Sequence, residues 1–321
     1  MNLETTPLPV NCPAVTVVIP TYNHRKFVLL AIESVLKQTF RDFEIVVVND
    51  GSPDDTAVLL QPLVVSTAIR YIEQSNQGQA AARNRGLQAA RGEFVAFLDD
   101  DDAWPADKLA WQVAAMRDSA DAVLVYGIVE LTGSGNGHRY PGADAPTGWV
   151  LDAFAGAGWV RSPGQTLIRR TALDLIGGFD PEIWGTDDWD LYIRLAKYGP
   201  FIFAPRLALI YRCHSSNASN DFWRMYANAR KVMSKHFPPF PERVSLRRRW
   251  ACRRFIQKFC GDDAVQAALK YTSQLRWWEA GKAWAQAIWI RPSLIFRRTV
   301  RDGLLRLIVD VLTHRPSSSG N

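Results

Sequence analysis

Four consecutive carboxylates directly after a short apolar segment are the residues of this chain best placed to do chemistry. Residues 94–98 are wholly apolar and predict a buried strand, and four aspartates follow it: Asp99, Asp100, Asp101 and Asp102. Two like charges about 4 Å apart repel by roughly 4 kcal/mol at an effective dielectric of 20, so such a cluster favours a positive partner. Magnesium is usually held by one or two carboxylates together with substrate phosphates, which predicts a divalent-cation site. A solvated acidic loop that caps a helix starting near Pro105 is the alternative.

A second acidic group lies further along the chain. Asp187, Asp188 and Asp190 precede residues 191–198, whose apolar spacing predicts a helix that begins with these acids. Negative side chains in the first turn of a helix interact favourably with the helix dipole and can cap the helix. By its residues alone, this group therefore predicts a helix start.

The elements that must position these acids alternate between strand and helix. Runs rich in β-branched residues predict strands at 15–19, 44–48, 69–72, 94–98 and 123–129. Apolar residues at helical spacing predict helices over 25–37, over 79–90 and from residue 105 onward. The alternation predicts an α/β fold in which helices cover both faces of a mostly parallel sheet, with 132–148 as a loop. Ligands of such sheets bind outside the carboxyl ends of the strands, where the four aspartates lie.

Composition divides the chain into three parts. We predict a polar N-terminal tail at 1–14, the α/β domain at 15–221, and a basic, tryptophan-rich helical region at 222–321 with a disordered end at 316–321. Region 222–321 contains 20 Lys and Arg against 6 Asp and Glu, a net charge of +14, whereas 1–221 contains 18 against 26, a net charge of −8.

The mixture of arginine and tryptophan in the basic region suits an anionic membrane surface, and we expect no nucleic-acid partner. A helical bundle with solvated arginines and core aromatics is the alternative. The residues concerned are Arg247, Arg248, Arg249, Trp250, Arg253, Arg254, Trp277 and Trp278.

The N-terminal segment, the length of the apolar runs and the cysteines predict the cellular compartment. The first dozen residues carry no basic segment leading into an apolar one, and no run approaches the roughly 20 apolar residues that span a bilayer. The four cysteines form no CxxC pair or disulfide-like framework, which fits a reducing compartment. We therefore expect a cytoplasmic protein, peripheral at the inner face of the plasma membrane if the basic region docks there.

Six short segments in a fixed order carry the most specific signal. They lie at 17–23, 46–52, 82–86, 97–102, 177–180 and 187–190, and together they resemble the family 2 glycosyltransferases over about residues 15–217. The resemblance implies the GT-A fold, a Rossmann-like α/β sheet, here followed by a C-terminal helical extension. It also implies an inverting transfer from a nucleoside diphosphate sugar, most commonly a UDP-sugar, with Mn²⁺ or Mg²⁺ as cofactor. Surface polysaccharide or glycolipid assembly in bacteria is the usual setting, with a saccharide or lipid-linked acceptor.

The resemblance assigns donor binding to residues at the carboxyl edge of the sheet. These are Pro20, Thr21, Tyr22, Asn23, Asp50, Arg83, Asp99 and Asp100. A tyrosine ring at such an edge can stack on a base, and a carboxylate can accept a hydrogen bond from a base imide or a ribose hydroxyl. Asp50 also fits ordinary turn chemistry, since Asn-Asp-Gly-Ser is a common strand exit. Arginine suits bidentate recognition of phosphate.

Metal binding and catalysis map onto the two acidic groups. The family's Asp-x-Asp motif corresponds to Asp99 and Asp101, and a bound cation there stabilises the departing nucleoside diphosphate. His214 ends a predicted strand, where it ligates the metal, pairs with phosphate or is structural. The general base of the family corresponds to Asp188, which takes the proton of the acceptor hydroxyl. On the acceptor side we place Trp184, Asp187 and Trp189, with core packing as the alternative for the tryptophans.

Other functions fit less well. A sugar nucleotidyltransferase would need a glycine-rich, basic phosphate loop after the first strand, where this chain has Pro20 to Asn23, and a nicotinamide dehydrogenase would need GxGxxG there. A membrane- or partner-binding module, with a non-catalytic nucleotide-sugar domain, stays open as a second function. Specificity lies in pocket walls and loops, so the sugar, acceptor and linkage are not encoded in the shared motifs.

Overall fold

The computed structural model describes residues 12–133, 137–214, 217, 221–236 and 246–313. They belong to two compact units, Met1–Asn217 and Ala218–Asn321. The predicted boundary between 221 and 222 lies four residues beyond this division. Most of the predicted N-terminal tail and all of 316–321 fall outside the described residues.

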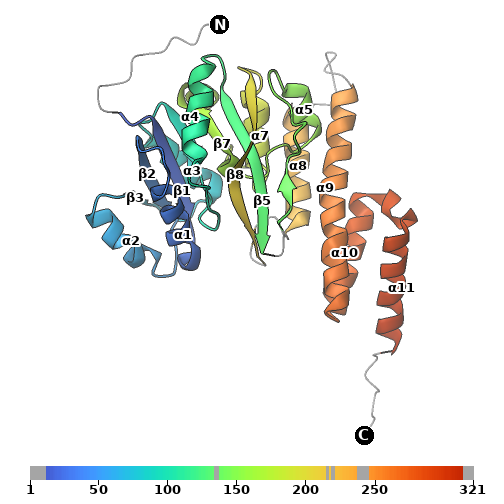
Figure 1. Ribbon diagram of the computed structural model, residues 1–321. Coiled ribbons are helices and arrows are strands. Elements are labelled where there is room, and N and C mark those ends of the chain that lie inside the picture. Colours follow the sequence, from blue (N-terminus) through green and yellow to red (C-terminus); the bar gives the residue numbers. More distant parts are fainter. Residues whose placement is uncertain (1–11, 134–136, 215–216, 218–220, 237–245, 314–321) are drawn as a thin grey trace. The chain divides into compact units, whose positions relative to one another are not determined.

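The first half of the sheet is parallel (Figure 1). It consists of β1 (Val15–Thr21), β2 (Phe43–Asn49), β3 (Arg70–Glu73) and β4 (Phe94–Phe97), in the spatial order β3-β2-β1-β4. All three pairings are parallel, because a helix carries the chain back between one strand and the next. The first four predicted strands are confirmed to within two residues at each end.

The second half of the sheet is mixed, but four of the seven strand pairings of the sheet are parallel, which confirms the mostly parallel arrangement expected from the sequence. It contains β5 (Leu124–Gly133), β6 (Arg139–Tyr140), β7 (Thr166–Arg169) and β8 (Phe201–Cys213). β7 lies between β4 and β5 and is antiparallel to both, whereas β8 runs parallel to β5. The predicted loop at 132–148 is wrong in part, since β6 lies within it and pairs with β5.

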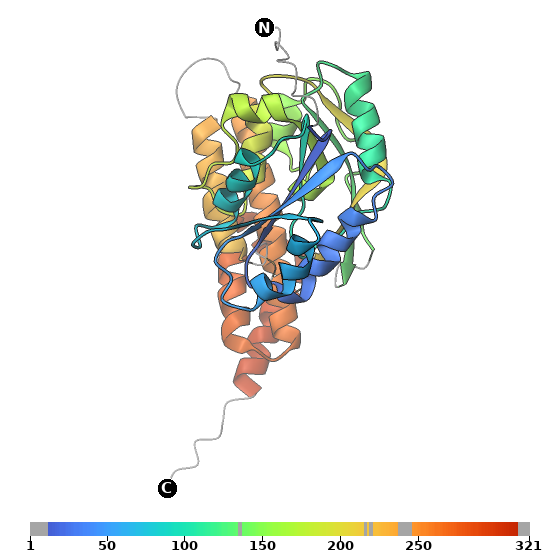
Figure 2. The same cartoon turned by 90° about the vertical axis from the view of Figure 1, so that its left-hand side faces the viewer.

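Helices cover both faces of the sheet, as predicted (Figure 2). On one face lie α1 (Arg25–Leu36), α2 (Thr56–Val65) and α4 (Lys108–Asp118). On the other lie α3 (Gln79–Gln88), α5 (Leu151–Gly156), α6 (Arg170–Ile176) and α7 (Asp187–Leu195). In β1, Val17 and Ile19 enter the first core and Val18 the second, because successive strand residues point to opposite faces. A Cβ on Gly86 would lie 2.2 Å from Val18, so the glycine allows α3 to approach β1 closely.

The second unit is helical, which confirms the predicted C-terminal extension. It contains α8 (Phe222–His236), α9 (Leu246–Ser273), α10 (Trp277–Ile290), the 3₁₀ helix η3 (Pro292–Phe296) and α11 (Arg298–Thr313). Trp284 is fully buried in its core between Ala268 and Val300. No helix in the described part of the chain is long and apolar enough to cross a membrane.

Candidate active site

The carboxyl ends of β1 and β2 bring the predicted donor residues to one edge. The strands pair in parallel with Thr21 opposite Asn49. Pro20 and Thr21 are buried, whereas Tyr22 exposes 46% of its surface. An exposed ring at this edge is available to stack on a flat ligand.

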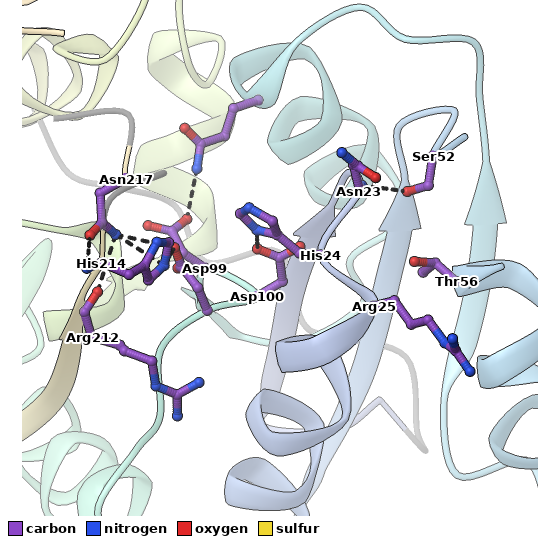
Figure 3. A network of polar contacts seen from close by, with 12 residues as sticks. Asn23, His24, Arg25, Ser52, Thr56, Asp99, Asp100, Arg212, His214 and Asn217 are labelled. Atoms are coloured by element: carbon purple, nitrogen blue, oxygen red, sulfur yellow. Dashed lines mark hydrogen bonds and ion pairs between the residues drawn. The ribbon is translucent and has the colours of Figure 1, made fainter. Parts of the chain in front are cut away.

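Hydrogen bonds join the turns that follow these two strands (Figure 3). The backbone N–H of Asn23 donates to Ser52 Oγ at 3.0 Å, and the N–H of Ser52 donates to Asn49 Oδ1 at 3.0 Å. Asn23 has φ of +55°, a left-handed conformation that asparagine adopts more readily than most residues. The turn after β1 is therefore held in one shape against the turn after β2.

Asp50 ties the end of β2 to the start of α3. Its Oδ1 accepts from Gln74 Nε2 at 2.8 Å and from the N–H of Gln77 at 2.9 Å, and its Oδ2 accepts from the N–H of Gly78 at 2.8 Å. The side chain is buried, with 3% exposure. The turn role considered for this aspartate is thus present, and a base contact would use the remaining lone pairs of the same carboxylate.

Arg83 connects the two acidic groups. From the middle of α3, its guanidinium donates to Asp99 Oδ1 at 2.6 Å through one arm and to Asp187 Oδ2 at 2.7 Å through the other. Only 2% of the residue is exposed. Burial lowers the pKa of Arg83, but the two carboxylates more than offset this and raise it above its usual value. The two acidic groups lie in separate motifs of the sequence. In the fold, a single charged side chain joins them.

The neighbouring residue Asn84 fixes the segment that leads to α7. Its amide pairs with the backbone of Phe179, donating to the carbonyl and accepting from the N–H, both at 2.8 Å. A Cβ on Gly178 would lie 2.5 Å from Asn84 Oδ1, and its φ is +74°, so glycine is required there. Gly178 is therefore architectural, and it allows the segment that leads to α7 to pack on α3.

The first two aspartates of the run have different partners. Asp99 Oδ1 accepts from Gln79 Nε2 at 3.0 Å, besides its bond to Arg83, and its Oδ2 accepts from Ser162 Oγ at 3.2 Å. Asp100 turns to the opposite side and pairs with His24 Nδ1 at 2.8 Å (Figure 3). Asp99 is thus held by donors from two elements, and Asp100 by a residue from the turn before α1.

The last two aspartates face the end of β8. Asp101 Oδ2 lies 3.1 Å from His214 Nε2 and 3.4 Å from Asn217 Nδ2. Asp102 Oδ1 accepts from the backbone N–H of Arg212 at 2.9 Å. Asp101 therefore lies against the imidazole of His214, as Asp100 lies against that of His24.

The charges in this cluster shift one another's pKa values. The hydrogen bond to Asp100 raises the pKa of His24 to about 9, so the imidazole is positively charged at neutral pH. Burial, opposed by His24, raises the pKa of Asp100. Burial and the neighbouring Asp99 raise the pKa of Asp101 to about 6, and burial and Asp101 raise that of Asp102. Ionised carboxylates are therefore costly here, and a bound cation would lower that cost.

The donor atoms fit a divalent cation. Asp100 Oδ2 and Asp102 Oδ2 are buried and have no hydrogen-bond partner among the described residues. Asp101 and His214 present oxygen and nitrogen ligands 3.1 Å apart. Within the same part of the chain, no three His, Cys, Asp or Glu side chains already converge as a metal site. A cation here would thus take further ligands from substrate phosphates, as Mg²⁺ commonly does.

The acids that open α7 differ in their burial and in their hydrogen-bond partners. Asp187 is 3% exposed and bound to Arg83, and Asp190 is buried and accepts from Arg194 at 2.8 Å. Asp188 is partly exposed. Burial and the adjacent Asp187, opposed by Arg83, raise the pKa of Asp188 to about 8. Such a carboxylate is a stronger base than an ordinary aspartate.

The two tryptophans that flank Asp188 differ in their surroundings. Trp189 is 7% exposed and its indole N–H donates to the carbonyl of Phe154 at 2.7 Å. This ring therefore packs in the interior, which is the alternative considered above. Trp184 lies in the segment before α7 and is half-buried.

About half of the chain, within the first unit, matches a known protein family. Residues 16–177 match the family described as Glycosyl transferase family 2. The chain belongs to glycosyltransferase family 2. Chondroitin synthase of Escherichia coli is 27% identical to this glycosyltransferase over 216 residues, which are 64% of this chain and 30% of that enzyme. The chain spans less than two thirds of the length of the curated relatives that it matches first.

Two solved structures show the same GT-A fold as this family 2 glycosyltransferase. S. aureus TarS 1–349 in complex with UDP has a TM-score of 0.59 at 18% identity and covers 92% of this chain and 88% of its own. A mannosyltransferase from Pyrobaculum calidifontis in complex with GDP-Man and Mn²⁺ has a TM-score of 0.61 at 20% identity, with 97% and 89% covered. At these identities the likeness concerns the fold.

Several residues of the candidate site were not predicted from the sequence. His24, Gln79, Ser162 and Asn217 each contact one of the four aspartates. Gln79 and His24 lie next to predicted motifs, so their polar character was a usable signal. Ser162 lies 63 residues from its partner Asp99, and only the fold brings the two together.

Proposed function

We propose that this chain is an inverting, metal-dependent glycosyltransferase that moves a sugar from a nucleoside diphosphate sugar to an acceptor hydroxyl. The observation that carries the proposal is the bridge through Arg83, which lies 2.6 Å from Asp99 and 2.7 Å from Asp187. It joins the acids after β4 to the acids that open α7, which supports a single site. Membership of family 2 indicates which reaction such a pair of acidic groups performs.

The donor would occupy the carboxyl edge of β1, β2 and β4. We assign stacking on the base to Tyr22, a hydrogen bond to the base or ribose to Asp50, and the diphosphate side to Arg83 with Asp99. The exposed ring of Tyr22 and the buried, hydrogen-bonded carboxylate of Asp50 support these assignments. UDP in TarS and GDP-Man in the mannosyltransferase are nucleotides of the same class, and we propose a UDP-sugar for this chain.

We assign the cation site to Asp101 and His214, with Asp99 beside them. A bound Mn²⁺ or Mg²⁺ stabilises, as a Lewis acid, the negative charge that the departing nucleoside diphosphate gains. The Mn²⁺ in the mannosyltransferase supports this cofactor class. Asp100 and Asp102 each use one oxygen, for His24 and for the backbone N–H of Arg212, and their second oxygens stay available as further ligands.

We assign the general base to Asp188. Its carboxylate takes the proton of the acceptor hydroxyl while that oxygen bonds to the anomeric carbon. The bond between the anomeric carbon and the phosphate oxygen breaks on the opposite side, and its electron pair leaves with the nucleoside diphosphate. One displacement of this kind inverts the anomeric centre. The partly exposed position of Asp188 and its raised pKa support the role.

We also propose a setting for the reaction. The name of the chondroitin synthase supports polysaccharide assembly, and surface polysaccharide or glycolipid synthesis would supply a saccharide or lipid-linked acceptor. The four cysteines form no CxxC pair, which supports the reducing, cytoplasmic location that we propose.

Calorimetric titration with UDP, GDP and their sugars, with and without Mn²⁺, tests the donor site. We expect one nucleotide to bind in a metal-dependent way, and Asp101→Asn to weaken that binding at least tenfold. Asp174→Asn, on the exposed side of α6, is the matched control and should bind as the unaltered protein does. Absence of binding by every nucleotide to the folded protein would contradict the proposal.

A further inference from the structure

We infer that η3 and α11 form a docking surface for an anionic lipid bilayer. This inference is independent of the reaction proposed above. The residues of η3 and α11 differ from those that the sequence singled out in the basic region, which lie at 247–250, 253–254 and 277–278. The side chains of 247–250 are among those that the structure does not describe.

The first observation is that α11 is apolar on two faces. Val300, Gly303, Leu304 and Leu307 form the inner face, which packs in the core of the unit. A Cβ on Gly303 would lie 2.3 Å from the ring of Trp284, so the inner face is in close contact with α10. A surface helix of a globular protein normally has a single apolar stripe toward its core.

The second face of α11 is exposed. Leu305, Ile308 and Val309 have the i, i+3, i+4 spacing of one helical face and are 59%, 54% and 55% exposed. Just before α11, Ile295 is 44% exposed and Phe296 83% exposed. Several large apolar side chains exposed on one helical face mark an interaction site, whereas single exposed ones are ordinary. We call these five residues the α11 surface.

The charged residues beside the α11 surface indicate which kind of partner binds there. Arg297, Arg298, Arg301 and Arg306 accompany the α11 surface and are all exposed. Arg301 and Arg306 make no ion pair within the described part of the chain, and region 222–321 carries a net charge of +14. A basic helix with an exposed apolar face lies in the plane of an anionic membrane, where the apolar residues enter the interface and the arginines meet the headgroups. A second copy of this chain is less suitable, because the arginines that accompany the two α11 surfaces would repel one another.

Flotation of the full-length protein with lipid vesicles tests the inference. We expect binding to vesicles that contain phosphatidylglycerol and little binding to pure phosphatidylcholine. The triple substitution Phe296→Ser, Leu305→Ser and Ile308→Ser should reduce binding at least tenfold. Arg301→Gln and Arg306→Gln should each reduce it by about fivefold at low salt, because each arginine contributes through its charge.

A matched control separates vesicle binding through the α11 surface from nonspecific binding through any exposed aromatic side chain. Trp278 on α10 is as exposed as Phe296, at 83%, and Trp278→Ser should bind vesicles as the unaltered protein does. Circular dichroism checks that each variant is folded. Equal vesicle binding by the triple variant, or no binding by the unaltered protein, would overturn the inference. So would sedimentation that shows a dimer lost in the triple variant without any vesicle binding, since the surface would then join two copies.

Discussion

At the scale of single residues, the site separates four adjacent aspartates into different roles by giving each a different partner. Asp99 is held by Arg83, Asp100 by His24 and Asp102 by the backbone of Arg212. Adjacent like charges are stable only when each is compensated. The acidic run in the sequence predicts a charged site, but the assignment of each carboxylate depends on partners that come from distant segments.

Asp188→Asn should stabilise the protein increasingly as pH rises from about 5 to about 8. The folded-state pKa of Asp188, about 8, lies above its usual value, so the folded protein binds a proton that the unfolded chain has lost. The contribution of Asp188 to the free energy of unfolding is therefore fully present below the pKa that this group has in the unfolded chain. It is lost as the pH rises through the pKa that the group has in the folded protein. Asparagine does not titrate. Thermal unfolding of both proteins at several pH values measures the difference, and a difference that is constant with pH would refute the raised pKa.

His24→Phe should weaken donor binding about tenfold at neutral pH. The phenyl ring keeps the contacts of His24 with Phe27 and His214 but removes the partner of Asp100, whose other oxygen already has no partner in the described region. Nucleotide titration in the presence of Mn²⁺ provides the measurement. Lys26→Ala, exposed on α1, is the control. Equal affinities would mean that His24 has no positioning role.

At the scale of elements, the parallel half of the sheet and the helices that cover it could be predicted from the sequence. The apolar and helical periodicities there are clear because the strands are buried on both faces. The antiparallel pairings of β7 in the mixed half could not be predicted, since they join β7 to β4 and β5 between residues far apart in the chain. The same limit applies to Ser162, which precedes β7 and reaches Asp99 only in the fold.

Arg83→Met should lower the free energy of unfolding by about 3–5 kcal/mol, because it leaves the buried carboxylate of Asp187 and the partly buried one of Asp99 without their shared cation. Urea denaturation measures the loss. Arg85→Met, exposed on the same helix, should change stability by less than about 0.5 kcal/mol. A small effect at both positions would show that Arg83 does not hold α3 and α7 together.

At the scale of the whole molecule, the chain contains two units of opposite charge, each with its own core. Residues 1–221 carry −8 and 222–321 carry +14, so the two parts suit different partners. The family match at 16–177 falls within the first unit, and the α11 surface within the second. The division of charge was visible in the sequence, whereas the exposed and buried faces of α11 required the structure.

Trp284→Ala should destabilise the helical unit by about 3–5 kcal/mol, because the ring is fully buried among Ala268, Ala287 and Val300. Nucleotide binding should persist, since every residue assigned to the donor lies in the first unit. Hydrogen exchange reports the loss in α9 to α11, and calorimetry reports binding in the same sample. Loss of nucleotide binding together with the helical protection would show that the donor site depends on the second unit.

The most direct test of the proposed reaction is single-turnover transfer by Asp188→Asn with the nucleotide sugar identified by titration. The account predicts that this variant binds the donor with unchanged affinity and transfers the sugar at least about a thousandfold more slowly than the unaltered protein, because only the base is missing. Asp174→Asn should transfer at the normal rate. Normal transfer by Asp188→Asn would contradict the assignment of this aspartate as the base and, with it, the proposed mechanism.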